Sequence, residues 1–395
     1  MHSVKLFATA ALALGASTVS AASTCTKDVK ITEPTQTVNC DVVDADITIS
    51  SSISGDVTIN GPKQIKGDFI ANNASSLISL TSTTINSITG TFQLQNLEKL
   101  STLEFSSLKS VGEITLVKLP QLSSLNFGTE GVTKINSIQI TDTFISDLSG
   151  LSVATVENFQ IDNNKQITKF ESDLVNITGT LIINNNGNDF QISMKELELA
   201  GEFQISNIKS FSAPLLAKLT KSLKFDKNDE LTSFAAPNLT SIADDVSFIN
   251  NKKLTNISMP ALTTIDGGFT IQNNTAMKAI SGFDELKNVT GAIILRGNFS
   301  KVTLPSLESV AGTVTVTSTT DISSFCDFFK DLKDDGKIEG EETCTWNNKE
   351  ANEDNGNGGD SSSDSSDDNE DAAGMTSVSF AVLGLTAIAA MFQLL

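Results

Sequence analysis

Carboxylates are the side chains of this protein that could carry out chemistry. The single histidine, His2, lies in an apolar N-terminal stretch, so the chain has no histidine once that stretch is removed. Ser-His-Asp triads, Cys-His pairs and histidine-ligated metal sites are then excluded. Two carboxylates alone can cleave a glycan. The candidate clusters are Asp226, Asp229 and Glu230; Asp244 and Asp245; and Asp284 and Glu285.

The residues available around these acids argue against a catalytic site. Sugar subsites are usually built from tryptophan and tyrosine rings, but this chain has no tyrosine and a single tryptophan, Trp346. Its phenylalanines fall on alternating strand positions and are expected to be core. We therefore interpret the acidic clusters as a solvated surface and expect no enzyme, no cofactor and no metal. The net charge of −20 also argues against nucleic-acid partners.

The element that positions these residues is a repeat of about 22 residues, within the range of leucine-rich-type solenoids. In each copy a polar or glycine residue precedes an apolar-x-apolar triplet, and successive triplets start 20 to 24 residues apart. Two earlier copies, at Val57 and Phe69, lie only 12 residues apart and predict irregular N-terminal coils. The regular triplets begin at Phe92, Ile114, Ile138, Phe159, Leu181, Phe203, Leu223, Val246, Phe269, Ile293 and Val314.

Each copy also contains a second apolar-x-apolar pair, such as Ile257 and Met259. Alternation with a period of two, together with β-branched and aromatic residues, predicts a strand. Proline recurs after this pair and marks a corner, because it cannot donate a ladder hydrogen bond; the prolines are Pro214, Pro237, Pro260 and Pro305. The sequence predicts an all-β parallel solenoid whose coils consist of strand, turn, strand, corner and short return, with no helix.

In many coils an asparagine lies three residues after the second apolar residue of the first strand. In a leucine-rich-type repeat this residue turns inward and bonds the backbone of the turn. A row of binding amides is the weaker alternative. The predicted ladder consists of Asn164, Asn186, Asn228, Asn251, Asn274 and Asn298. The outward residues of the first strands form a polar, nearly uncharged stripe: Gln93, Thr115, Gln139, Gln160, Thr180, Gln204, Ser247 and Thr270.

Four cysteines allow three disulfide connectivities. We favour the local pairs Cys25–Cys40 and Cys326–Cys344, because each pair flanks the repeats and can cap one end of the solenoid. Trp346 and the segment from Phe325 to Phe329 are expected to lie against the last coil.

The N-terminus has the order of a secretory signal peptide: Lys5, an apolar stretch from Leu6 to Ala16, and small residues before a cleavage site. We expect cleavage after Ala21, with Ala22 as the alternative. A secreted chain can carry N-glycans. We expect them at Asn73, Asn176, Asn238, Asn256, Asn273 and Asn288, whereas Asn298 should be poorly occupied because it belongs to the inward ladder.

The C-terminus has the order of a glycolipid (GPI) anchor signal. Residues 350–371 are rich in Asn, Gly, Ser and acids and contain no Lys or Arg, which predicts an extended stalk. Small residues follow, and the stretch from Val378 to Leu395 is almost entirely apolar. We expect attachment at Asp371, with Asn369 and Ala372 as alternatives, so that a lipid anchor is the only contact with the membrane.

This order of parts resembles the fungal GPI-anchored cell-wall organisation proteins, which include extracellular-mutant and sporulation-specific proteins. The repeats are similar to the L domains of receptor ectodomains. The resemblance covers essentially the whole chain: signal peptide 1–21, solenoid 22–349, stalk 350–371 and removed anchor signal 372–395. It implies a non-catalytic role in cell-wall organisation, at the outer face of the plasma membrane and in the wall. Wall glycans or wall glycoproteins are the implied partners. The alternatives are a carboxylate-dependent glycan-remodelling enzyme and a receptor-like binding module.

Overall fold

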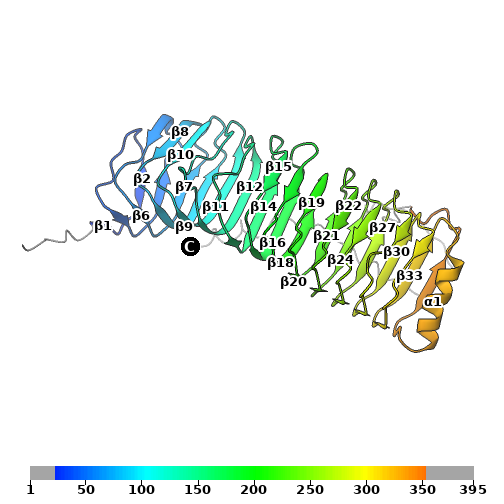
Figure 1. Cartoon of the computed structure of the whole chain (residues 1–395). Helices are drawn as coiled ribbons and strands as arrows, with labels where there is room; N and C mark the ends of the chain where they lie inside the picture. The colour runs from blue at the N-terminus through cyan, green and yellow to red at the C-terminus, as the bar shows by residue number, and fades with distance from the viewer. Residues whose placement is uncertain (1–22, 353–395) are drawn as a thin grey trace, which may run out of the picture. The chain divides into compact units, whose positions relative to one another are not determined.

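The computed structural model describes residues 23–352, which form a parallel β-solenoid of about 13 turns. The coils stack side by side from β1 to α1, and every strand pairing is parallel (Figure 1). The predicted fold class is therefore confirmed.

The first strands of successive coils form one unbroken ladder, here called the main ladder. Each strand pairs with the equivalent strand of the previous coil and of the next one. In order, the main ladder consists of β2 (Val29–Ile31), β4 (Ile47–Ile49), β7 (Phe69–Asn72), β9 (Ser87–Gln95), β11 (Ser110–Leu119), β12 (Lys134–Thr143), β14 (Asn158–Asp162), β16 (Asn176–Asn184), β18 (Leu199–Ile205), β21 (Leu223–Asp226), β24 (Val246–Ile249), β27 (Phe269–Gln272), β30 (Ile293–Gly297), β33 (Val314–Ser318) and β34 (Glu342–Thr345).

The second strands form four short, separate side sheets. These sheets are β5 (Ser54–Thr58), β8 (Ser76–Ser82) and β10 (Thr102–Phe105); β15 (Lys169–Glu171), β17 (Gln191–Ser193) and β19 (Ser210–Ser212); β22 (Ser233–Ala235) and β25 (Asn256–Ser258); and β28 (Ala279–Ile280) and β31 (Lys301–Val302). Val57 lies in β5, so it belongs to a second strand and not to a first one. The 12-residue spacing therefore separates two different strand types and is no sign of an irregular coil. Only the first N-terminal coil is short, since the equivalent residues Val29 and Ile47 are 18 residues apart.

The return after each proline corner is a third strand, which the sequence did not predict. These strands are two residues long and join the main ladder at its edge, or merge with the start of the following first strand. The separate ones are β1 (Thr24–Cys25), β3 (Val42–Val43), β6 (Gln64–Ile65), β13 (Thr155–Val156), β20 (Lys218–Leu219), β23 (Ser241–Ile242), β26 (Thr264–Ile265), β29 (Asn288–Val289) and β32 (Ser309–Val310).

The core is a continuous column of alternating apolar residues enclosed by the three strands of each coil. Phenylalanines pack together within it, in agreement with the prediction that they form the core. The ring centroids of Phe225 and Phe234, in the same coil, lie 5.0 Å apart, and those of Phe225 and Phe248, in neighbouring coils, lie 5.4 Å apart. Such contacts add to the free energy of simple burial, so each coil stabilises its neighbours.

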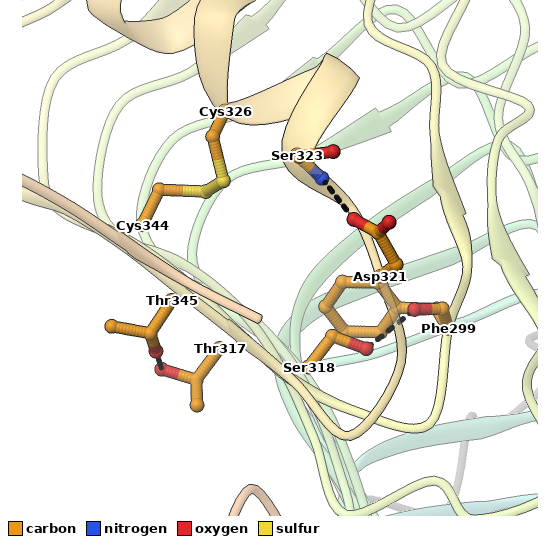
Figure 2. Close-up of a disulfide and its surroundings, with 8 residues drawn as sticks. All are labelled: Phe299, Thr317, Ser318, Asp321, Ser323, Cys326, Cys344 and Thr345. Atoms are coloured by element: carbon orange, nitrogen blue, oxygen red, sulfur yellow. Dashed lines mark hydrogen bonds between the residues drawn. A yellow bond between two sulfur atoms is a disulfide. The ribbon is translucent and has the colours of Figure 1, made fainter. Parts of the chain in front are cut away.

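Disulfides with the predicted local pairing lie near both ends of the stack, with Cα–Cα distances of 5.9 Å for Cys25–Cys40 and 5.6 Å for Cys326–Cys344. At the C-terminal end Cys326 belongs to a helix, α1 (Ser323–Asp334), and Cys344 belongs to β34 (Figure 2). The expectation of no helix was therefore wrong. The apolar side of α1 consists of Cys326, Phe329 and Leu332, which are buried against the last coil.

Trp346 was predicted to pack against the last coil, but it directly follows the end of β34 and is 45% exposed. No helix among residues 23–352 is long and apolar enough to cross a membrane.

Candidate functional site

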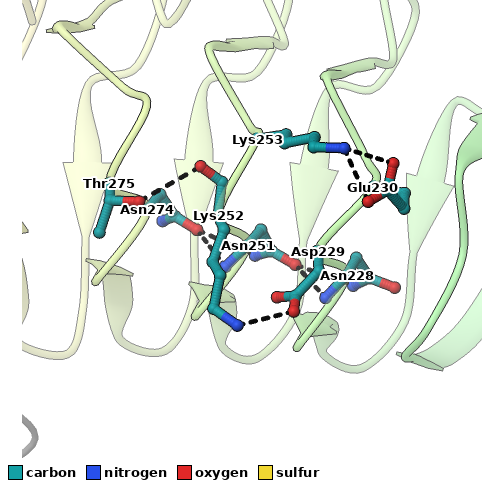
Figure 3. A network of polar contacts seen from close by, with 8 residues as sticks. All are labelled: Asn228, Asp229, Glu230, Asn251, Lys252, Lys253, Asn274 and Thr275. Atoms are coloured by element: carbon teal, nitrogen blue, oxygen red, sulfur yellow. Dashed lines mark hydrogen bonds and ion pairs between the residues drawn. The ribbon is translucent and has the colours of Figure 1, made fainter.

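Two acids of the first candidate cluster, Asp229 and Glu230, take part in contacts between coils (Figure 3). Asp229 pairs with Lys252 of the next coil at 2.7 Å, and Glu230 pairs with Lys253 at 2.6 Å. All four side chains are largely exposed, so these ion pairs contribute little to stability.

The other two clusters also have structural contacts or face solvent. The Asp244 carboxylate accepts a hydrogen bond from the Ser222 hydroxyl at 2.9 Å, and Asp245 accepts one from the Gly268 amide at 2.8 Å. Asp284 and Glu285 are exposed in a turn. Within the described part of the chain, no group of Cys, Asp, Glu or His side chains is placed to hold a metal ion.

The asparagine ladder is present in five of the six predicted positions, where the side chains are buried. The Asn251 side-chain oxygen accepts bonds from the backbone amide and the side-chain amide of Asn228, both at 2.9 Å. Asn274 does the same for Asn251, at 2.9 and 3.0 Å (Figure 3). Because the Asn251 amide also donates to the Phe225 carbonyl at 3.0 Å, these side chains satisfy the buried backbone of the turn.

The residue before each ladder position has a left-handed backbone conformation, with positive φ, which turns the next side chain inward. Asn250 and Asn273 have φ of 59° and 57°, values that asparagine tolerates well. Gly297, which precedes Asn298, lacks a positive φ and continues β30 in register with Ser318. The Asn298 side chain therefore lies outside the ladder, where it donates to the Thr275 carbonyl at 3.0 Å. The prediction for Asn298 was wrong.

The ladder also has a member and a break that sequence reasoning missed. Thr143 occupies the equivalent position one coil before Asn164, and its hydroxyl donates to the Asn164 oxygen at 2.6 Å. In the coil between Asn186 and Asn228 the position is taken by Ile208, which provides only its backbone amide, 3.1 Å from the Asn228 oxygen. Asp142 directly precedes Thr143 and Asn207 directly precedes Ile208, and both have a positive φ. An Asp or Asn before the ladder position was therefore the sequence signal that could have located both positions.

A column of glycines lines the corner that leads into the main ladder. A Cβ atom on Gly291 would lie 2.5 Å from the carbonyl carbon of Gly267, and one on Gly312 would lie 2.5 Å from that of Gly291. Backbones of successive coils thus approach too closely for any side chain. This explains why glycine precedes so many of the first strands.

The outward side of the main ladder, here called the ladder face, is a long polar surface. Its central row is in register from coil to coil and contains Gln93, Thr115, Gln139, Gln160, Ile182, Gln204, Lys224, Ser247, Thr270, Ile294 and Thr315. A second row, two residues further on, contains Gln95, Val117, Thr141, Asp162, Asn184, Asp226, Ile249, Gln272, Arg296 and Thr317. Most of these side chains are amides or hydroxyls, and Lys224 is paired with Glu202 at 3.0 Å.

The predicted glycosylation sites lie away from this central row. Asn73 follows β7, Asn176 and Asn288 begin strands on the return edge, and Asn238 lies in a proline corner. Asn256 is exposed on the side sheet strand β25. Asn273 differs from these sites, because its left-handed turn leaves it only 6% exposed. A glycan at Asn273 is thus at odds with the fold.

One open hollow of about 480 Å³ lies along the turns that follow the main ladder. Polar residues line it, among them Asn73, Asn96, Lys118 and Asp142. The Asn96 side-chain amide donates to the Asn73 oxygen at 2.9 Å. Asn73, a predicted glycan acceptor, therefore lies in the wall of this hollow.

Comparison with known proteins gives relatives along most of the chain. No protein-family model and no solved structure matches it. The chain is 36% identical to the protein ecm33 of Aspergillus fumigatus over 307 residues, which cover 78% of this chain and 76% of that one. It is 36% identical to the cell surface GPI-anchored protein ECM33 of Candida albicans, over 78% of this chain and 74% of the other. The cell wall mannoprotein PST1 of Saccharomyces cerevisiae is 32% identical, over 76% and 67% of the two chains.

Proposed function

The chain belongs to the family of fungal cell-surface proteins that includes ecm33 and PST1, and from this membership we propose that it is a GPI-anchored cell-surface glycoprotein that maintains cell-wall organisation as a non-catalytic scaffold. The observation that carries the proposal is 36% identity, over most of both chains, to a protein named for its cell surface location and GPI anchor.

The proposed organisation follows the sequence. Residues 1–21 direct secretion, residues 22–349 form the solenoid, and residues 350–371 hold it away from the membrane. Residues 372–395 are exchanged for the lipid anchor at Asp371. These terminal segments lie outside the described residues, apart from Glu350, Ala351 and Asn352. Ala351 is fully buried and the Asn352 side-chain amide donates to the Asn298 oxygen, so this short segment packs on the solenoid and the stalk begins after it.

Two further findings support a scaffold over a glycan-remodelling enzyme. The names of the relatives describe location and wall membership and no enzyme activity. Asp229 and Glu230 lie in exposed ion pairs, Asp244 and Asp245 accept hydrogen bonds from neighbouring coils, and Asp284 and Glu285 are exposed in a turn. A pair of acids flanking a scissile bond needs a defined separation inside a substrate cleft, and these acids have no such setting.

The proposal is tested by complementation in a strain that lacks the gene. The full chain should restore resistance to a wall-binding dye, whereas a variant without residues 378–395 should be released into the medium and fail to restore it. The control is the same truncated chain fused to an unrelated anchor signal, which should restore resistance. Full rescue by the released, unanchored chain would contradict the proposal.

A further inference from the structure

The ladder face differs from the other surfaces of the solenoid by its continuity. The main ladder passes without interruption from β2 to β34, whereas the second strands are divided into four separate side sheets. Adjacent strands lie about 4.8 Å apart. The ladder face therefore presents equivalent side chains at regular intervals over many coils, a geometry that matches a repeating polymer better than a small ligand.

The chemistry of this face is mainly neutral hydrogen bonding, and the charged residues of the second row are Asp162, Asp226 and Arg296. The chain carries a net charge of −20, yet the central row contains one charged residue, Lys224, and that residue is paired with Glu202. The glutamines Gln93, Gln139, Gln160 and Gln204 offer both donors and acceptors. A neutral polyhydroxyl chain fits such a surface, since it pairs with amides and hydroxyls and brings no charge that the acidic protein would repel.

The N-glycan acceptor sites also lie outside the central row of this face. The exposed sequons lie in turns, in a corner, at return edges or on a side sheet. The exposed acceptors Asn238, Asn256 and Asn288 lie outside both rows of the ladder face, whereas Asn73 directly follows Asn72, which is in register with Gln95 at the N-terminal end of the second row.

We propose that the ladder face binds a neutral wall polysaccharide that lies along the stack of coils. This inference rests on the proposed wall function and names the partner of that function. The binding is made by rows of side-chain amides and hydroxyls between β9 and β33, with small aliphatic contacts from Ile182 and Ile294.

Two matched substitutions test the face. Gln139→Asn, in the central row on β12, creates a glycan acceptor together with Thr141. Gln191→Asn, in the side-sheet strand β17, creates one together with Ser193. Both are single Gln→Asn changes at surface positions. An added glycan on the ladder face should block the polymer, whereas a glycan on the side sheet should not.

The measurement is co-sedimentation of the detergent-extracted full chain with particulate β-glucan, with chitin particles and with immobilised mannan. Wild type and Gln191→Asn are expected to bind one of these polymers equally, and the polymer bound identifies the source. Gln139→Asn should lose at least tenfold in affinity, and enzymatic removal of N-glycans should restore most of it.

A second pair of variants does not depend on glycosylation. Gln139→Glu with Gln160→Glu places charges in the central row, and Gln121→Glu with Gln191→Glu places the same charges on exposed positions elsewhere. Only the first pair should weaken binding.

Three results would overturn the inference: no binding of wild type to any of the polymers, equal binding by variants of both faces, or a wild-type dimer that Gln139→Asn converts to a monomer. The last result would assign the face to a second copy of the chain. Each of these can occur while the wild-type chain still rescues the deletion strain, so failure of this inference is distinguishable from failure of the proposed function.

Discussion

At the scale of single residues, the fold depends on side chains that satisfy the backbone of tight turns. Asn251 is fully buried and bonds both the preceding coil and the following one. A polar group in such a place stabilises the fold only because every bond is made; a missing partner leaves buried donors and acceptors unpaired. The same amides that could suggest a binding row are thus part of the interior.

Replacing Asn251 by alanine should destabilise the protein by about 2–4 kcal/mol, because the Phe225 carbonyl and the Asn228 amide lose their partners. Denaturant unfolding of the full chain measures this loss. The exposed turn residue Asn188 provides the control, and Asn188→Ala should change stability by less than about 0.5 kcal/mol. Equal effects of the two substitutions would contradict a structural role for the ladder.

Glu342 should make the C-terminal cap sensitive to pH. It occupies the inward register position beside Val314, where one carboxylate oxygen is buried without a hydrogen-bond partner. Burial raises the pKa of the Glu342 carboxyl, and the charge of Lys330 opposes this shift in part. The folded state therefore binds this proton more tightly than the unfolded state does, so stability falls as pH rises from 4.5 through the raised folded pKa.

The substitution Glu342→Gln removes this titration. We expect the variant to melt at a higher temperature than wild type at pH 7, and the difference to shrink as the pH falls below 4.5. Thermal unfolding monitored by circular dichroism at both pH values measures it. A constant difference at all pH values would show that the carboxyl titrates alike in both states.

Glycan occupancy should follow exposure. Asn273 is buried by its left-handed turn and by its coil neighbours, so we expect it to remain unmodified, whereas the exposed Asn238, Asn256 and Asn288 should carry glycans. Glycopeptide mass spectrometry of the secreted chain reports each site. Full occupancy at Asn273 would mean that its turn stays open in the folded protein.

At the scale of elements, two features determine the shape of each coil: the alternation of inward and outward residues along its strands, and the close approach of its backbone to that of the next coil. The first and second strands could be located from the sequence, because inward and outward residues alternate along them. The third strands could not, since two residues such as Thr264 and Ile265 carry no periodic signal. Helix α1 was missed because Phe325 and Phe328 are also apolar and obscure its buried side.

Two adjacent glycines, Gly267 and Gly268, allow a matched test of the close contact between coils. A Cβ on Gly267 would lie 2.6 Å from the Asp244 carbonyl carbon, whereas a Cβ on Gly268 would lie 3.4 Å from the nearest atom, a side-chain oxygen. Gly267→Ala should therefore push two coils apart and cost about 1–3 kcal/mol, while Gly268→Ala should be close to neutral. Denaturant melts of both variants, with hydrogen exchange in β24 and β27, compare them directly. A neutral Gly267→Ala would show that the coils can move apart freely.

At the scale of the whole molecule, the sequence could predict a solenoid with polar outward positions but not which strand row would become a continuous face. That outcome depends on the pairing of second strands across coils of unequal length, as in the break between β10 and β15. The candidate acids show the same limit. Asp229 and Glu230 are a plausible catalytic cluster in one dimension, and only the stacking of coils brings Lys252 and Lys253 against them.

The central claim, that the protein serves the wall without catalysis, is tested most directly by neutralising the acids of the first and third candidate clusters in the full chain; Asp244 and Asp245 are left unchanged, because they accept hydrogen bonds from the Ser222 hydroxyl and the Gly268 amide. The variant combines Asp226→Asn, Asp229→Asn, Glu230→Gln, Asp284→Asn and Glu285→Gln, and its melting temperature verifies that it folds. Introduced into the deletion strain, it should restore resistance to a wall-binding dye to the level of the unmodified chain. A folded variant that fails to restore resistance would contradict the scaffold account and assign these carboxylates to a glycan-remodelling reaction.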